Sequence, residues 1–208
     1  MDGLCYERTE TIKLPRLVER DISMDKIHEV NYELNALPWD PPLKKRMPIQ
    51  KPGRSKQDYG TPPELLAAIK RRLGIGQFDI DLAASAENAV CVNYYDEAMD
   101  ALADRNPWKV TQGGWAFCNP PYSHIEPWVT KAVREADAGA HIAMLLPAST
   151  GSNWWAAWVE GYAYTLFLNG RVTFVGCSAP YPKDSALILY TPQFFLGHEI
   201  WFWENENL

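Results

Sequence analysis

Residues 115–147 read WAFCNPPYSHIEPWVTKAVREADAGAHIAMLLP, and this stretch predicts a strand, a turn, a helix and a second strand in succession. The run 115–119 is mostly apolar and ends at two prolines, which cannot continue the ladder of a central strand. Apolar side chains then recur at helical spacing up to about Gly139, at Ile125, Trp128, Val129, Ala132, Val133 and Ala136. The continuous apolar run 141–147 is typical of a strand buried on both faces. Such a strand–helix–strand unit predicts parallel pairing.

The same alternation continues on both sides of this unit. Upstream, Thr61 is predicted as the N-cap of a helix, with Pro62 at its first position, Glu64 completing a capping box and Gly74 at its end. A strand is expected over 78–84. Downstream, we expect strands over 163–168, 171–175 and 185–190 and a short helix over 154–160. The predicted fold class is therefore α/β, with a mostly parallel sheet and helices on both faces.

The composition changes near residue 57, which divides the chain into an N-terminal extension over 1–56 and a main domain over 57–208. In the extension, Ile27, Val30, Leu34 and Leu37 share one helical face and predict a short helix. A proline-broken basic segment follows, with six positive charges at Lys44, Lys45, Arg46, Lys51, Arg54 and Lys56. The net charge of the chain is −6, which weighs against general nucleic-acid binding. The basic segment is either a solvated linker or a contact to phosphates.

The rest of the composition favours a soluble protein of the cytoplasm. No apolar run approaches the roughly 20 residues that cross a bilayer, and the first ten residues lack the pattern of a signal peptide. The four cysteines and four histidines are scattered along the chain, at Cys5, Cys91, Cys118 and Cys177 and at His28, His124, His141 and His198. This scatter predicts neither disulfides nor a metal site.

Ligands of α/β sheets bind beyond the carboxyl ends of the strands, and we expect the polar strand ends Asp81 and Asn119 to lie on that same edge. Asn119-Pro120-Pro121-Tyr122 is the most informative motif. Five others flank it: Asp58-Tyr59-Gly60-Thr61-Pro62, Asp81-Leu82-Ala83-Ala84-Ser85, Asp100-Ala101-Leu102, Met144-Leu145-Leu146-Pro147-Ala148 and Gly170-Arg171. In this order, over roughly residues 56–190, the chain resembles the phage-type, Dam-like DNA N6-adenine methyltransferases.

That resemblance implies a Rossmann-like methyltransferase fold over 57–208, with S-adenosylmethionine as cofactor and DNA as partner. It implies a catalytic turn made of Asn119, Pro120, Pro121 and Tyr122. The methionine end of the cofactor would contact Tyr59, Thr61 and Pro62, and its amino group would approach Asp81. Leu82, Ala83, Ala84 and Ser85 belong to the same strand-end cofactor motif. Asp100 would bind the adenosine portion, with Asp96 as the alternative. The resemblance also implies a phage or prophage protein in the host cytoplasm, for which restriction–modification is one context.

The chemistry of adenine methylation explains these residue types. The exocyclic nitrogen of adenine is a poor nucleophile because its lone pair is delocalised into the ring. Two acceptors aimed at its hydrogens would localise that lone pair, and the side-chain carbonyl of Asn119 and the backbone carbonyl of Pro120 can serve. The two prolines stiffen the turn. Tyr122 offers a face on which a flipped base can stack, which is worth about 1–3 kcal/mol.

Other readings of the same residues stay open at this point. The same chemistry could act on RNA adenine, on a free nucleotide or on a protein glutamine amide. A catalytically silent nucleic-acid-binding module is a further alternative. Locally, Asn-Pro-Pro-Tyr could be an ordinary turn, Asp81 an exposed strand-end carboxylate, and Thr61 a helix cap only.

Overall fold

The computed structural model describes residues 59–193 and 196–204. The predicted extension over 1–56, with its helix and basic segment, lies outside the described residues, so the proposed domain boundary stays a prediction. Within the described part, no helix is both long enough and apolar enough to cross a membrane.

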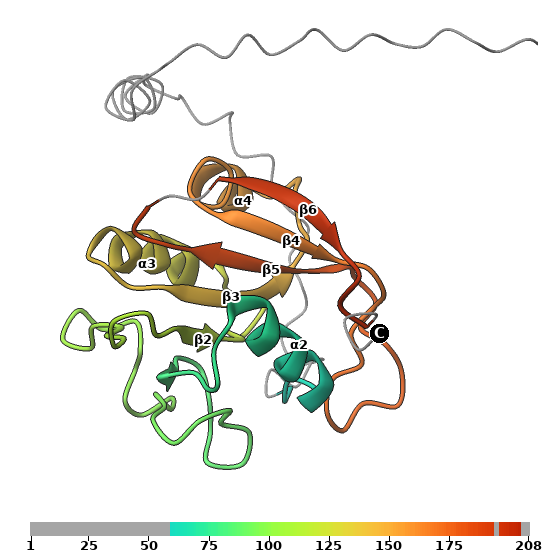
Figure 1. Cartoon of the computed structure of the whole chain (residues 1–208), viewed down its shortest axis with the longest axis horizontal. Helices are drawn as coiled ribbons and strands as arrows, with labels where there is room; N and C mark the ends of the chain where they lie inside the picture. Colours follow the sequence, from blue (N-terminus) through green and yellow to red (C-terminus); the bar gives the residue numbers. More distant parts are fainter. Residues whose placement is uncertain (1–58, 194–195, 205–208) are drawn as a thin grey trace, which may run out of the picture. The chain divides into compact units, whose positions relative to one another are not determined.

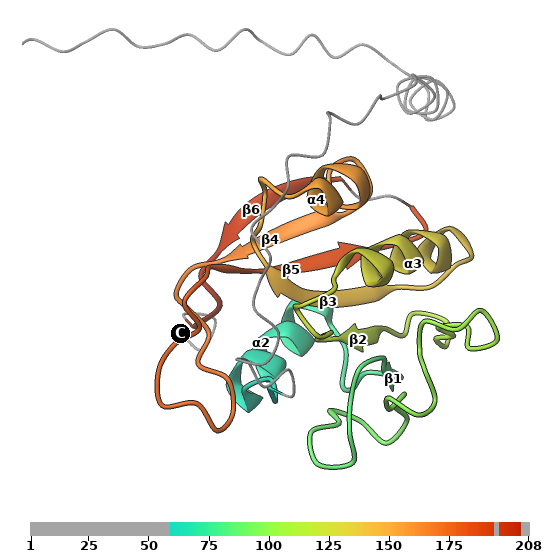
Figure 2. The same ribbon diagram turned by 180° about the vertical axis from the view of Figure 1, so that it is seen from behind.

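A six-stranded mixed sheet forms the centre of the fold (Figures 1 and 2). Its strands are β1 (Ile80–Asp81), β2 (Ala116–Cys118), β3 (Ile142–Pro147), β4 (Tyr164–Leu168), β5 (Ser185–Tyr190) and β6 (Gly197–Trp201). They are ordered β1-β2-β3-β5-β4-β6. The β1–β2, β2–β3 and β4–β6 pairs are parallel, whereas β5 is antiparallel to both of its neighbours. Five of the six strands therefore run in one direction, and β5 alone is reversed.

The strand predicted over 171–175 is wrong. These residues form no strand, and Val175 makes only an isolated bridge to Gly60. Their alternating pattern arises because Val172 and Phe174 are buried while Thr173 and Val175 are exposed. Phe174 is buried against the 59–61 segment and not within the sheet. Alternation of buried and exposed residues therefore did not indicate strand pairing here.

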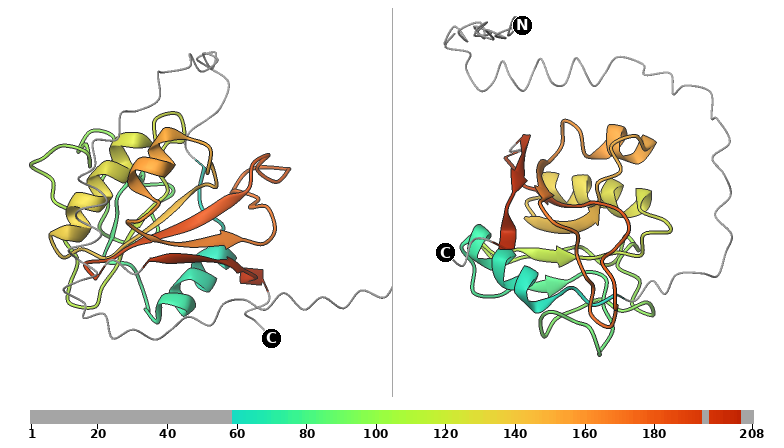
Figure 3. Two further views of the ribbon diagram at one scale, coloured as in Figure 1. Left: turned by 90° about the horizontal axis from the view of Figure 1, so that it is seen from above. Right: turned by 90° about the vertical axis from the view of Figure 1, so that its right-hand side faces the viewer.

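Within the described residues, three helices cover the two faces of the sheet, as predicted (Figure 3). Helix α2 (Pro63–Leu73) lies on one face, and α3 (Glu126–Asp137) and α4 (Asn153–Trp158) lie on the other. Successive side chains of β3 point to opposite faces of the sheet. Leu145 packs in the cluster that contains Leu65 of α2, while Met144 packs in the cluster that contains Val129 of α3.

The start of α2 differs from the prediction. Its N-cap is Pro62 and no side chain caps it, so neither the Thr61 cap nor the capping box with Glu64 forms. Thr61 is buried, and its hydroxyl instead accepts a hydrogen bond from Asn119. The predicted end is confirmed: Gly74 adopts the left-handed conformation, with φ of 67°.

Candidate active site

The Asn119–Tyr122 turn and the strand-end motif lie at one edge of the sheet, where β1 and β2 both end. Asp81 is the last residue of β1 and is paired with Phe117, while Asn119 directly follows β2. The Leu82 N–H also donates to the Phe117 carbonyl at 2.8 Å, which keeps the two strand ends side by side. The expectation that Asp81 and Asn119 share one edge is therefore confirmed.

The side chain of Asn119 is fixed by residues from the start of the described chain. Its Nδ2 donates to the Tyr59 carbonyl at 3.0 Å and to Thr61 Oγ1 at 3.2 Å. Both amide hydrogens are used in these two bonds, so Oδ1 is the atom that the amide can offer to a ligand. The Tyr59-Gly60-Thr61 segment thus orients a carbonyl oxygen at the end of β2.

An aromatic cluster of Tyr59, Tyr122, Phe174 and Tyr181 lies beside this amide. The rings of Tyr59 and Phe174 stack at 5.6 Å between centroids. Tyr122 meets Phe174 and Tyr181 edge to face at 6.2 and 5.6 Å, and Phe174 meets Tyr181 in the same way at 5.8 Å. Three of the four residues are half-buried and Phe174 is buried. The cluster therefore joins the 59–61 segment, the Asn119–Tyr122 turn and the loop between β4 and β5.

This 169–184 loop is held against the 59–61 segment by its backbone. The Val175 N–H donates to the Gly60 carbonyl at 2.9 Å, and the Tyr181 N–H closes the loop on the Val172 carbonyl at 2.8 Å. A Cβ added to Gly60 would lie 3.2 Å from the Cβ of Val175, closer than most such contacts. A glycine therefore suits this position because the two backbones approach closely.

Tyr122 and Cys118 are unsuited to proton transfer or to nucleophilic attack at neutral pH. The Tyr122 hydroxyl donates to the Leu145 carbonyl at 3.3 Å, and burial raises the pKa of this phenol well above its usual value. Cys118 is fully buried, as expected from its place before the turn, and burial raises the pKa of its thiol well above the usual range. What remains at the turn is a set of carbonyl acceptors and aromatic rings.

Asp81 is a buried carboxylate with only 3% of its surface exposed. Its Oδ1 accepts the Ala83 N–H at 3.2 Å and its Oδ2 accepts the Val90 N–H at 3.1 Å. Burial raises its pKa to about 6, although the two hydrogen bonds oppose this effect. None of the ion pairs within residues 59–193 and 196–204 includes Asp81. The predicted exposed strand-end alternative is therefore wrong, because the carboxylate is enclosed.

The other predicted cofactor residues are more widely distributed. Leu82 packs its side chain in the core, whereas Ser85 begins a turn, its N–H donating to Asn88 Oδ1 at 2.6 Å. Pro62 is buried at the start of α2, and Pro120 is buried at the turn. Their roles toward a ligand, like those of Pro121, Ala83 and Ala84, stay predictions.

Asp96 and Asp100 lie in the segment between β1 and β2. Tyr94 forms an isolated parallel bridge with Asp81, so Asp96 follows at the same sheet edge. Asp100 is exposed and has a positive φ of 57°, a conformation that aspartate tolerates better than most residues. Each carboxylate accepts a local backbone N–H, from Met99 for Asp96 and from Leu102 for Asp100. The choice between the two for the adenosine portion stays open.

Sequence reasoning missed Phe174 and Tyr181 as members of this site. The available signal was two aromatic residues within 169–184, a loop that contains two glycines and two prolines. It also missed the anchoring of Asn119, because hydrogen bonds that join positions 58 and 60 residues apart leave no local pattern.

The chain was compared with known proteins. The model of the family described as DNA N-6-adenine-methyltransferase (Dam) matches residues 50–188. A protein of Escherichia phage T1 named DNA N-6-adenine-methyltransferase is 31% identical over 115 residues, which are 55% of this chain and 46% of that protein. The chain thus spans about half the length of this curated relative. Because the family model covers most of the chain, including both strand ends and the aromatic cluster, the protein belongs to the Dam family of DNA N-6-adenine-methyltransferases.

Proposed function

We propose that the protein transfers a methyl group from S-adenosylmethionine to the exocyclic amino group of adenine in DNA, with the target base flipped out of the duplex. The observation that carries this proposal is the anchored amide of Asn119. Its nitrogen is occupied by Tyr59 and Thr61, which leaves its oxygen as an acceptor beside the aromatic cluster. Membership of the Dam family supports the same chemistry.

In this proposal, the turn supplies acceptors for a nitrogen that becomes positively charged. The adenine amino group donates its hydrogens to Asn119 Oδ1 and to the Pro120 carbonyl. As the new N–C bond forms and the methyl–sulfur bond of the donor breaks, leaving its electron pair on sulfur, these fixed dipoles would stabilise the developing positive charge without reorganising. The amino nitrogen then releases one proton to solvent. A protonated Tyr122 fits this scheme, because direct transfer needs neither a phenolate nor a thiolate at the turn.

The aromatic cluster would hold the extruded base. Flipping costs a few kcal/mol of lost pairing and stacking, and stacking on aromatic rings returns about 1–3 kcal/mol per base. Tyr122, Tyr59 and Tyr181 are half-buried, so part of each residue remains accessible. The ring of Tyr122 is held by its edge-to-face contact with Phe174 and by the hydrogen bond from its hydroxyl to the Leu145 carbonyl.

The residues at the strand ends fit S-adenosylmethionine, which when bound supplies the electrophilic methyl group. An enclosed carboxylate without an ion-pair partner in the described residues suits the ammonium of an amino acid. Asp81 would therefore hold the amino group, and Tyr59, Thr61 and Pro62 would line the methionine end. An acidic residue of the 96–100 segment would bind the adenosine hydroxyls.

The proposal extends to fold type and setting. The sheet order, with one reversed strand between strands of the opposite direction, supports a Rossmann-like methyltransferase fold. The phage T1 relative supports a phage or prophage protein, which would act on DNA in the cytoplasm of the host cell.

The direct test uses methyl-deuterated S-adenosylmethionine. The full chain is incubated with duplex DNA, the DNA is digested to nucleosides, and the label is located by mass spectrometry. Labelled N6-methyldeoxyadenosine is expected with the wild type and is expected to be lost with Asn119→Ala. Parallel reactions contain RNA, dATP or a glutamine peptide. If label appeared only in one of those substrates, that substrate and not DNA would be the methyl acceptor. Cofactor binding without methyl transfer to any of them would favour a silent binding module.

A further inference from the structure

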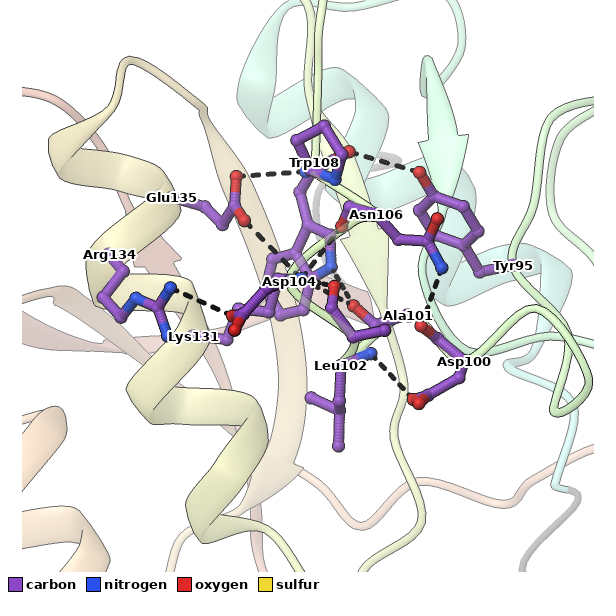
Figure 4. A network of polar contacts seen from close by, with 12 residues as sticks. Tyr95, Asp100, Ala101, Leu102, Asp104, Asn106, Trp108, Lys131, Arg134 and Glu135 are labelled. Carbon is purple, nitrogen blue, oxygen red and sulfur yellow. Dashed lines mark hydrogen bonds and ion pairs between the residues drawn. The ribbon is translucent and has the colours of Figure 1, made fainter.

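Lys131 is a buried lysine in the middle of α3, with 4% of its surface exposed. Its Nζ donates to three backbone carbonyls, at 2.9 Å to Ala101, 2.8 Å to Ala103 and 2.9 Å to Asn106 (Figure 4). An ammonium group carries three hydrogens, so each carbonyl receives one of them. The lysine thus replaces its entire hydration shell with the backbone of one loop.

The charge of Lys131 is balanced from its own helix. Glu135, one turn later, places Oε1 3.6 Å from Nζ and accepts the Trp108 N–H at Oε2 at 3.0 Å. The ammonium also lies 5.5 Å from the centroid of the Trp108 ring, within the range of a cation–π contact. Burial lowers the pKa of Lys131, and the Glu135 carboxylate opposes that effect. Helix and loop therefore share one compensated buried charge.

The loop held by Lys131 spans residues 96–107 and is closed on itself. The Tyr95 hydroxyl donates to the Pro107 carbonyl at 3.2 Å, which joins its two ends. Asn106 Nδ2 donates to the carbonyls of Met99 at 2.6 Å and Asp100 at 3.0 Å. The loop contains no strand or helix, so its carbonyls have no ladder to bind them. The Ala101 carbonyl also accepts Trp108 Nε1–H and the Ala103 carbonyl also accepts the Asn106 N–H, so an apolar side chain at position 131 would remove one of two donors from each and the Lys131 donor from the Asn106 carbonyl.

The 96–107 loop begins at the sheet edge that carries the candidate site. Tyr94 forms a parallel bridge with Asp81, so the chain leaves the sheet where β1 ends. The loop then carries Asp96 and Asp100, the two candidates for the adenosine portion of the cofactor. On the other side, α3 begins only a few residues after the Asn119 turn. Lys131 thus connects the helix that follows the catalytic turn to the loop that holds both acidic candidates.

We infer that Lys131 is a positioning residue, which holds the 96–107 loop in the conformation that binds the adenosine portion of S-adenosylmethionine. This inference rests on the proposed function and adds a residue outside the motifs that the sequence indicated. Burying an ion costs free energy that only complete pairing offsets, and here three loop carbonyls, the Glu135 carboxylate and the Trp108 ring supply that pairing. The three-carbonyl arrangement sets the positions of residues 101, 103 and 106, and with them the path of the backbone after Asp100.

The test compares Lys131→Met with Arg134→Met on the same helix. Among the described residues, Arg134 pairs with Asp104 of the same loop at 3.2 Å, but both side chains are exposed, and an exposed ion pair contributes only about 0–1 kcal/mol, so its loss should change the loop little. Hydrogen exchange is measured with and without S-adenosylhomocysteine, and the affinity of that ligand is measured by calorimetry. In the wild type, the ligand is expected to slow exchange in residues 96–107. Lys131→Met is expected to speed that exchange and to raise the dissociation constant at least tenfold, with Arg134→Met unchanged.

Steady-state kinetics provide a readout that general destabilisation would not produce. Lys131→Met is expected to raise KM for S-adenosylmethionine while kcat at saturating cofactor stays within about twofold. A loosened loop with unchanged ligand affinity would overturn the inference and leave Lys131 a structural anchor.

If Lys131→Met does not fold, Asn106→Ala takes its place, because it removes two hydrogen bonds within the same loop. It is expected to raise the dissociation constant and KM in the same way, and unchanged values would again overturn the inference. Wild-type protein that fails to bind S-adenosylhomocysteine would overturn the proposed function itself, and this inference with it.

Discussion

Replacement of Asp81 by asparagine should separate cofactor binding from stability. The Asp81 carboxylate is enclosed, and its pKa is raised from 3.8 to about 6. At 1.36 kcal/mol per pH unit, this difference corresponds to about 3 kcal/mol by which ionisation destabilises the folded state at neutral pH. Asp81→Asn removes that cost. Because the pKa of about 6 already includes the hydrogen bonds from Ala83 and Val90 to the ionised carboxylate, the variant should be at least as stable as the wild type at pH 7.

Cofactor affinity, in contrast to stability, should fall in Asp81→Asn. If the carboxylate accepts a hydrogen bond from the cofactor ammonium, its loss weakens binding by about 1.5–3 kcal/mol, which is about 10- to 150-fold in dissociation constant. Asp79→Asn is the matched control, because Asp79 lies just before the same strand but accepts its hydrogen bonds from Thr111. Calorimetry with S-adenosylhomocysteine should show the loss for Asp81→Asn and no loss for Asp79→Asn.

The pH dependence gives an independent check with a defined sign. Only the ionised carboxylate pairs with an ammonium, and with a pKa of about 6 roughly one tenth of the free protein is ionised at pH 5. Affinity should therefore rise about tenfold from pH 5 to pH 7 in the wild type and stay flat in Asp81→Asn. The stability of the ligand-free protein should change in the opposite direction. Because the folded pKa lies above the unfolded value, the contribution of this group is present below about pH 4 and is lost as pH rises through 6.

One result would refute this reasoning. A wild-type affinity that does not change between pH 5 and pH 7, together with unchanged affinity in a folded Asp81→Asn variant, would mean that Asp81 only holds the 82–90 segment. Its hydrogen bonds to Ala83 and Val90 would then be its whole role.

Three further predictions concern Asn119, Tyr122 and the basic segment. Asn119→Ala should lower kcat by about 10²–10³-fold, the range for one preorganised polar group, with a smaller loss in cofactor affinity; a kcat within a fewfold of wild type would remove Asn119 from the mechanism. Tyr122→Phe should keep its affinity for DNA in fluorescence anisotropy, whereas Tyr122→Ala should lose about 1–3 kcal/mol; equal losses would assign the effect to the hydroxyl. Neutralising Lys44, Lys45 and Arg46, which lie outside the described residues, should weaken binding to all DNA sequences alike and flatten the log–log salt dependence by about 0.9 per lost phosphate contact; an unchanged slope would identify the segment as a linker.

Much of the central fold could be predicted because its signals are local. The expected strand over 141–147 and the observed β3 differ by one residue at one end, and the helix ends beside Gly139 as its apolar spacing indicates. The reversal of β5 was not predicted, since strand direction depends on the path of the 169–184 loop and not on strand composition. β6 was missed altogether because it lies at the edge of the sheet and most of its residues are exposed.

Three of the local expectations that failed concern residues at the candidate site. Thr61 has the sequence context of a helix cap, yet its hydroxyl is bound to Asn119. Residues 171–175 alternate like a strand, yet Phe174 stacks on Tyr59. Asp81 ends a strand, where an exposed carboxylate was one interpretation, yet it is enclosed and its ionisation destabilises the fold. Folding favours local consistency, so departures from it concentrate where function imposes another requirement. Three such departures around one strand edge support, independently of any motif, the location of the site there.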